Sequence, residues 1–345
     1  MGTKINAKII ADSLSPSGSR ITTYLLTYPR FIHGELMTHR MFSRNSASSR
    51  AIPFKKMVKM AKEDPFIPIA WQKDHKGMQG TEYLEIKPNV FGPVNGWLEA
   101  RDKAVELANY LNELGVTKQL CNRLLEPFMW HTVIITATEF ENFFALRCPA
   151  YYDGKVNHRS IKDYLKANDS DIEKYPESYW KSINQSQAEI HIQALAESMW
   201  DAMNESIPEE LKSGEWHIPF GEYIDENPKV ETELELLSNK IHFTSIADSA
   251  DMEMLKVKIA TAMCAKLSYN NHGSIVNFSK DLDLHDMLLR NKHMSPFEHC
   301  ARVMSDVEYS LCYYKGSLTD KNSDKSNSGW CRNFKGFIQY RDLVE

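Results

Sequence analysis

The chain has 345 residues, of which 25% are charged and 42% hydrophobic, an ordinary balance for a soluble globular protein. The formal net charge of −5 excludes a global attraction to nucleic acid, so any polyanion site must be a local patch. Six cysteines form no C-x-x-C pair and predict neither a metal site nor a disulfide framework. No secretory leader or run of about 20 apolar residues is recognised. We therefore expect a cytoplasmic protein, bacterial or encoded by a virus that acts in its host.

Two strands open the chain, at residues 4–14 and 19–29, joined by a turn at "SPSGS". Pro29 suits the start of a helix, and an apolar stripe at helical spacing follows it, formed by Ile32, Leu36, Met37 and Met41. The periodicity stops after Phe42. Residues 43–53, "SRNSASSRAIP", therefore read as a polar loop.

The remaining elements are mostly helical. Residues 53–95 read as irregular surface, and residues 96–115 as an amphipathic helix ending at Gly115. Residues 117–149 are expected to hold two helices, the first interrupted by Pro127 and the second stopped by Pro149. Further helices are predicted at 185–203, 255–268 and 280–294, with a polar loop at 315–330. Long helices with a few strands predict an α+β fold.

The stretch "MTHRMFSRNSASSR", residues 37–50, combines the groups that bind phosphate. In an extended chain the alternate residues Arg44, Ser46, Ser48 and Arg50 would face one way and could address one anion. His39 and Arg40 could address a second phosphate or a polar ring. The same composition is typical of a solvated loop after a helix, and composition alone does not separate the two. Neither G-x-G-x-x-G nor a P-loop occurs.

Within this stretch, "HRMFSRNSASSR" resembles the signature of the flavin-dependent thymidylate synthases, the ThyX family. The matched positions, at the family's spacing, are His39, Arg40, Ser43, Asn45, Ser48 and Arg50. The segment "NFFALR", residues 142–147, is similar to the family's N-x-x-x-x-R helix, and "NRLLEP" with Arg123 precedes it. "SQAEI", residues 186–190, is similar to a following helix. The resemblance spans about residues 20–205.

A further match lies in an unexpected place. "HMSPFEH", residues 293–299, resembles a family motif that normally precedes the signature, and "LSY", residues 267–269, resembles the segment before it. We therefore expect a single ThyX-like catalytic domain over 1–345, with long helices on a mainly antiparallel sheet. Residues 1–205 would carry the motifs, and residues 256–345 would hold a displaced N-terminal-like segment, as in a circular permutation.

The resemblance implies an enzyme that makes dTMP from dUMP. Methylenetetrahydrofolate would supply the carbon, NADPH the reducing equivalents and FAD the redox chemistry. It also implies a homo-oligomer, a tetramer in the family, with no nucleic-acid or membrane partner. Two alternatives stay open. One is a ThyX-like methyl- or hydroxymethyltransferase that acts on another pyrimidine deoxynucleotide, dUMP or dCMP, for modified DNA. The other is a non-catalytic nucleotide-binding protein.

Residue roles follow from the same resemblance. Arg147 would be catalytic, contacting the pyrimidine and favouring its ionised ring. The alternative is a purely structural role, in which an Arg at the end of a helix complements the helix dipole. The other implied substrate-binding residues are Glu35, Ser46, Ser48, Arg50 and Arg123. The implied flavin-binding residues are Thr38, His39, Arg40, Asn142, His293 and Ser295. No metal ligand is predicted.

Three of these residues have structural alternatives. Glu35 and His39 could simply form an i,i+4 pair on a helix. Ser295 could be a helix N-cap with Glu298 closing a capping box, an arrangement that is compatible with phosphate binding.

The chain also departs from the family pattern. Thr38 replaces the first Arg of R-H-R, Ser46 replaces an acidic residue, and Thr136-Ala137-Thr138 replaces N-x-R. A lost Arg–phosphate fork costs on the order of 1–3 kcal/mol. These changes predict that flavin binds more weakly or in a different orientation, or that the substrate is a different pyrimidine.

Overall fold

The computed structural model describes residues 2–76, 80, 82–86, 91–226, 249–269, 278–313 and 333–345. The strands are β1 Asn6–Leu14, β2 Arg20–Pro29, β3 Ser43–Ser46, β4 Trp130–Ala137, β5 Tyr151–Tyr152, β6 Asn157–His158, β7 Glu209–Glu210, β8 Trp216–His217, β9 Ala301–Val303 and β10 Phe337–Gln339. The α-helices are α1 His33–Leu36, α2 Phe54–Glu63, α3 Pro93–Glu113, α4 Lys118–Cys121, α5 Glu141–Arg147, α6 Ile161–Ala167, α7 Glu177–Ile183, α8 Ile190–Glu205, α9 Gly221–Asp225, α11 Ser249–Ala265, α12 Phe278–Arg290, α13 Asp306–Tyr313 and α15 Tyr340–Val344. The 3-10 helices are η1 Arg30–Ile32, η2 Asn122–Phe128, η3 Ile172–Lys174, η4 Lys266–Tyr269 and η5 Ser295–Glu298.

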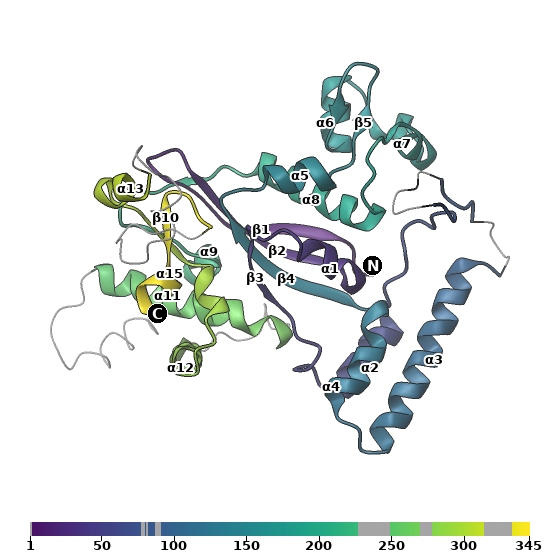
Figure 1. The fold of residues 1–345 in the computed structure, drawn as a ribbon, viewed down its shortest axis with the longest axis horizontal. Helices are drawn as coiled ribbons and strands as arrows, with labels where there is room; N and C mark the ends of the chain where they lie inside the picture. Colours follow the sequence, from purple (N-terminus) through teal and green to yellow (C-terminus); the bar gives the residue numbers. More distant parts are fainter. Residues whose placement is uncertain are drawn as a thin grey trace.

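The centre of the molecule is a mixed sheet with strand order β3-β4-β2-β1-β7 (Figure 1). The predicted hairpin is confirmed: β1 pairs antiparallel with β2, and Gly18 takes a positive φ of 79° in the turn between them. β2 and β3 both pair antiparallel with β4, and the short β7 adds a parallel edge. The α+β class and the mainly antiparallel sheet are therefore confirmed.

The strand β4 corrects the sequence analysis, which expected two helices across residues 117–149. Residues 132–136 are all β-branched and favour a strand. Since β4 lies between β2 and β3 and is buried on both faces, it shows no polar–apolar alternation to reveal it. The helical parts of this region are α4, η2 and α5, with Pro127 inside η2.

The helix predicted after Pro29 is shorter than its apolar stripe. Ile32 and Leu36 are buried, but Met37 and Met41 are 39% and 45% exposed because α1 ends at Leu36. The Thr38 hydroxyl donates to the carbonyl oxygen of Glu35 at 2.7 Å and occupies an acceptor at the helix end.

Two segments expected to be irregular are regular. Ser43–Ser46, assigned to a polar loop, forms the edge strand β3 on β4. Phe54–Glu63, assigned to irregular surface, forms α2, which buries Met57 and Ala61 four residues apart on one face.

The predicted helices ending at Gly115 and covering 185–203, 255–268 and 280–294 correspond to α3, α8, α11 and α12. Gly115 has a φ of 82°, as a residue after a helix end often does. On α8, the predicted face of Ile192, Leu195 and Met199 is fully buried. The loop predicted at 315–330 lies outside the described residues. No helix in the described ranges is long and apolar enough to cross a bilayer.

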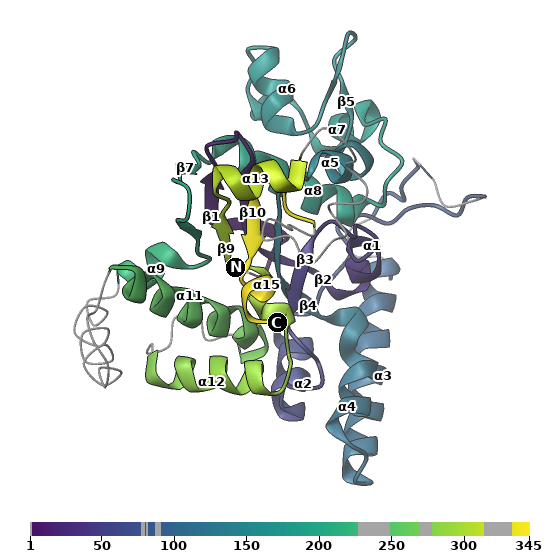
Figure 2. The ribbon, with the colours of Figure 1, turned by 60° about the vertical axis from the view of Figure 1, so that its left-hand side comes forward.

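Helices cover both faces of the sheet (Figures 1 and 2). On one face, Val133 and Ile135 pack in a core with residues of α5 and α8. On the other face, Ile134 packs with residues of α11, α12 and η5, which belong to the C-terminal part of the chain. Because neighbouring residues of a strand point to opposite faces, β4 joins the two cores.

A buried polar chain links the sheet to the C-terminal part. The Thr136 hydroxyl lies 2.7 Å from that of Thr23 and 2.8 Å from Nδ1 of His299. Thr23 also lies 2.8 Å from Nε2 of His217, whose Nδ1 is 2.9 Å from the Ser13 hydroxyl. All five side chains are buried. Thr136, a departure from the family pattern, thus has a structural partner in the last residue of "HMSPFEH".

Candidate active site

Arg147 occupies the last turn of α5 and joins two residues of the signature region. The buried Phe143 and Phe144 anchor α5 in the core. Nε of Arg147 donates to Nε2 of His39 at 3.2 Å, and Nη1 lies 3.8 Å from Oε2 of Glu35. We call Glu35, His39 and Arg147 the Arg147 cluster. It unites three predicted site residues that are up to 112 positions apart.

The cluster fixes the protonation of His39. Because Nε2 of His39 accepts a hydrogen bond from Nε–H of Arg147, His39 is neutral with its own proton on Nδ1. Burial and the neighbouring guanidinium lower the pKa of His39, which keeps it neutral. The imidazole, only 8% exposed, also packs edge-on against Phe143 with ring centroids 4.8 Å apart. It holds the guanidinium in a defined orientation.

Glu35 has the opposite tendency. Burial and then the nearby Glu189 raise the pKa of its carboxyl, against the opposing charges of Arg147 and His191. Glu189 caps α8, accepting from the backbone N–H of His191 at 2.8 Å, and its other oxygen contacts Nδ1 of the same His. Nε2 of His191 accepts from the backbone N–H of Ile69 at 3.0 Å. Glu189 and His191 therefore lie close enough to Glu35 to act on its charge.

A second junction connects the signature to the displaced motif. The Ser295 hydroxyl donates to Oδ1 of Asn45 at 2.8 Å, and Nδ2 of Asn45 donates to the carbonyl of Cys264 at 2.9 Å. The predicted capping box is wrong: η5 has only four residues, its N-cap is Met294, and Ser295 makes no cap bond. Glu298 instead forms an ion pair with Arg341 at 2.6 Å.

The expected phosphate loop packs against η2. Nδ2 of Asn122 donates to the carbonyls of Ser49 and Ile52 at 2.7 and 2.9 Å, and the Ser49 hydroxyl contacts Glu126 at 2.5 Å. This arrangement places the segments of Arg50 and Arg123 beside one another. Both arginines have exposed side chains and form no ion pair with a described residue.

The other predicted residues are peripheral. Among the described residues, no side-chain hydrogen bond engages Ser46, Arg40, Asn142 or His293, all of which are exposed. Ser48 is half-buried in the loop after β3, and its carbonyl accepts from the N–H of Ala51. The structure therefore gathers Glu35, His39 and Arg147, joins Ser295 to the signature, and leaves several expected donors open to solvent.

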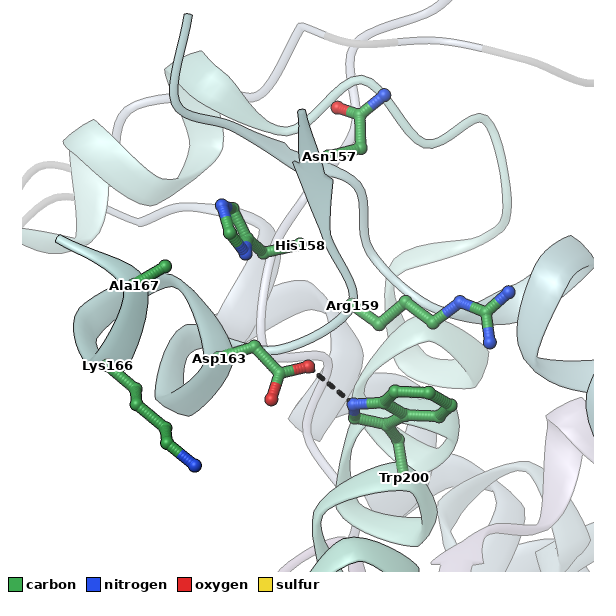
Figure 3. A pocket seen from close by; sticks show the side chains of 7 residues that line it. All are labelled: Asn157, His158, Arg159, Asp163, Lys166, Ala167 and Trp200. Atoms are coloured by element: carbon green, nitrogen blue, oxygen red, sulfur yellow. Dashed lines mark hydrogen bonds between the residues drawn. The ribbon is translucent and has the colours of Figure 1, made fainter. Parts of the chain in front are cut away.

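Of two hollows in the described part of the chain, one lies away from these residues and the other borders the loop after β3. One, of about 590 Å³, is open and lined by residues of β6, α6 and α8. In Figure 3 Arg159 extends over the Trp200 ring, 4.7 Å from its centroid, while the indole N–H donates to Asp163 at 2.5 Å. The other, of about 30 Å³, borders Ala47, Ser49 and Glu126. None of the predicted site residues lines either hollow.

Sequence reasoning missed several residues around the site. Glu189 lies in the matched "SQAEI" and His191 directly follows it, but neither had an assigned role, and Asn45 was matched without one. Arg30 was not singled out, although its guanidinium lies 2.5 Å from Nε2 of His131. Burial and Arg30 lower the pKa of that His to about 2. The matched motifs offered a signal for Glu189 and Asn45 and none for His191, Arg30 or His131.

Comparisons with known proteins give a structural likeness only. No protein-family model and no curated protein matches the chain. Its fold is similar to that of the UMP/dUMP methylase PolB from Streptomyces cacaoi. The PolB structure with 5-Br UMP gives 16% identity and a TM-score of 0.40, covering 59% of this chain and 90% of that chain. The structure with 5-Br dUMP gives 15% and 0.41, covering 59% and 92%.

Proposed function

We propose that the chain is a flavin-dependent enzyme that transfers a one-carbon unit to the pyrimidine ring of a deoxynucleotide. The observation that carries the proposal is the meeting of separately matched segments. The Arg147 cluster joins "NFFALR" to the signature, and the Ser295–Asn45 bond joins "HMSPFEH" to it. Two separately matched segments therefore both contact the signature region. Thymidylate synthesis from dUMP is the reaction that the resemblance implies.

Arg147 is the residue on which we place base recognition. Its guanidinium is held at Nε by His39, so the Nη groups remain to donate to ring oxygens or to an ionised ring nitrogen. A guanidinium keeps its charge across the physiological range and can stabilise an anionic ring without titrating. His39 then positions Arg147, and its Nδ1–H remains for another partner.

The loop after β3 and the adjoining η2 are the proposed phosphate site. Arg50 and Arg123 project from neighbouring segments and lack ion-pair partners in the described ranges, so both can fork onto an oxyanion. Ser46, the last residue of β3, would add a hydroxyl donor, and Ser48 lies in the loop itself.

The donor set fits a flavin dinucleotide in chemistry. Arg40, Asn142 and His293 are exposed and free to address phosphate or ring polar atoms, while Thr38 and Ser295 already donate to the protein. Bound FAD would supply the redox chemistry, with NADPH and methylenetetrahydrofolate as cosubstrates. In the described part of the chain these donors are exposed and no hollow encloses them. This is the arrangement expected of one copy if a second copy of the chain completes the site. We therefore also propose a homo-oligomer, a tetramer as in the family.

The test is the colour and the reaction of the purified chain. We expect a yellow protein with a flavin absorption band, directly or after addition of FAD. With methylenetetrahydrofolate and NADPH it should convert dUMP or dCMP to a product heavier by a methyl or hydroxymethyl group, identified by mass spectrometry. A protein that takes up no flavin and changes neither nucleotide would refute the proposal and leave nucleotide binding without catalysis.

A further inference from the structure

Glu35 presents an unusual acceptor beside the proposed base-binding guanidinium. Its side chain is 36% exposed, and no described residue donates a hydrogen bond to its carboxylate; the only partner is Nη1 of Arg147 at 3.8 Å. That distance is an ion pair without a hydrogen bond. The oxygens of Glu35 are therefore partly exposed, accept no hydrogen bond from a described residue and are open to a ligand.

The neighbouring Arg147 is fixed in orientation. Its Nε donates to the buried His39, so the Nη end of the guanidinium lies on the side of Glu35. Arg147 is itself 24% exposed. A ligand that approaches this edge therefore meets oriented donors from Arg147 next to the carboxylate acceptor of Glu35.

Pyrimidine bases differ at the atoms that such an edge would contact. Cytosine presents an amino donor at N4 and acceptors at N3 and O2 in a row, whereas uracil has acceptors at O4 and O2 on either side of the N3–H donor. An acceptor beside two donors complements cytosine: a carboxylate accepts from N4 and a guanidinium donates to N3 and O2. With uracil in the same pose, O4 would face the carboxylate. A uracil turned so that N3–H meets Glu35 leaves Arg147 only one ring oxygen.

We propose that Glu35 makes this site select a cytosine deoxynucleotide over a uracil deoxynucleotide by accepting a hydrogen bond from the N4 amino group while Arg147 donates to N3 and O2. This inference rests on the proposed function, because it assumes a pyrimidine nucleotide at Arg147. It commits the site to one of the two bases that the proposed function allows.

The surroundings of Glu35 add a dependence on pH. The charged and titratable groups that face it are Arg147 from α5 and Glu189 and His191 from the start of α8. Since burial and Glu189 raise the pKa of Glu35, acidification neutralises it earlier than an ordinary carboxyl. A protonated carboxyl can donate to O4 of uracil. The preference for cytosine should therefore narrow as the pH falls.

The experiment compares equilibrium binding of dCMP and dUMP to the full-length protein by calorimetry. Wild type should bind dCMP at least about fivefold more tightly than dUMP, the discrimination of one well-placed base contact. Glu35→Gln, whose amide can accept from N4 or donate to O4, should bring the two affinities within about twofold. Glu35→Ala, which lacks the acceptor, should lose the preference through weaker dCMP binding. The matched control is Glu63→Gln, at an exposed position paired with Lys59, and it should keep the preference.

The outcomes separate the two proposals. Wild-type protein that binds dUMP as tightly as dCMP, or a preference that survives in both Glu35 variants, overturns the role of Glu35 while the nucleotide site stands. Failure of wild-type protein to bind either nucleotide overturns the proposed function and this inference with it. Thermal unfolding of each variant confirms that the comparison is made on folded protein.

Discussion

The Ser295 hydroxyl donates a 2.8 Å hydrogen bond to Oδ1 of Asn45 across 250 residues of sequence. The bond joins the displaced "SPFEH" segment to the signature strand β3, and the same Asn45 also holds the end of α11 through the Cys264 carbonyl. Two segments that are far apart along the chain therefore lie side by side in the fold.

This bond predicts a measurable coupling. Ser295→Ala and Asn45→Ala should each destabilise the protein, Asn45→Ala more because it loses two hydrogen bonds. A double-mutant cycle by urea unfolding should give a coupling of about 0.5–1.5 kcal/mol, the net worth of one hydrogen bond. Ser182→Ala, in which the lost bond is local to α7, should show no coupling with Asn45→Ala. A coupling of zero between Ser295 and Asn45 would mean that the contact contributes nothing to stability.

Arg147→Ala should separate catalysis from folding. The side chain is partly exposed and its ion pair is long, so the free energy of unfolding should change by less than about 1 kcal/mol. Turnover should fall by about 100-fold or more, because the guanidinium stabilises the reacting ring, while flavin content is retained. The matched control is Arg290→Ala, an exposed arginine on α12, which should leave turnover unchanged. Turnover that survives in Arg147→Ala would contradict its catalytic assignment.

The buried imidazoles predict an acid-sensitive fold. Burial lowers the pKa of both His217 and His299 to about 3, whereas an unfolded His titrates at about 6.5. As the pH falls below about 6.5 the unfolded chain takes up these protons first, so the free energy of unfolding should fall until about pH 3. The loss is up to about 1.4 kcal/mol per pH unit for each His. Above pH 6.5 these two histidines do not make the free energy of unfolding depend on pH.

Urea unfolding across pH 4 to 8 would measure how the free energy of unfolding changes with pH. This range covers most of the interval between the folded and unfolded pKa values of the two histidines. His217→Gln and His299→Gln should flatten this slope, since glutamine keeps a polar atom for the threonine network without titrating. Substituting the exposed His293 by Gln serves as the control and should leave the slope as in wild type. An unchanged slope in both buried variants would place the acid sensitivity elsewhere.

Glu197 on α8 should act in the opposite sense. It accepts from the N–H of Ile161 at 2.7 Å, yet burial raises the pKa of its carboxyl to about 7. The folded protein then holds this proton more tightly than the unfolded chain. The contribution of Glu197 to the free energy of unfolding therefore falls as the pH rises from about 4.5 to 7. Glu197→Gln should therefore be more stable than wild type at pH 8, by on the order of 1 kcal/mol. A less stable variant at pH 8 would show that the ionised carboxylate is well accommodated.

The sequence predicted the elements that depend on local pattern. The hairpin of β1 and β2 and the helices α3, α8, α11 and α12 follow from alternation, helical spacing and glycine ends. The strand β4 escaped because burial on both faces removes alternation, and α2 escaped because its polar residues outnumber its two buried ones. In both cases the deciding partners lie elsewhere in the chain.

For the site, the sequence predicted the candidate residues, namely the signature positions, Arg147 and the "SPFEH" segment. It could not determine that Arg147 would rest on His39 beside Glu35, or that Ser295 would bond Asn45 instead of capping its own helix. Hydrogen-bond partners depend on the path of the chain in three dimensions, whereas periodicity and motif spacing record only neighbours along it. The tertiary structure alone therefore decided which of the candidate side chains meet.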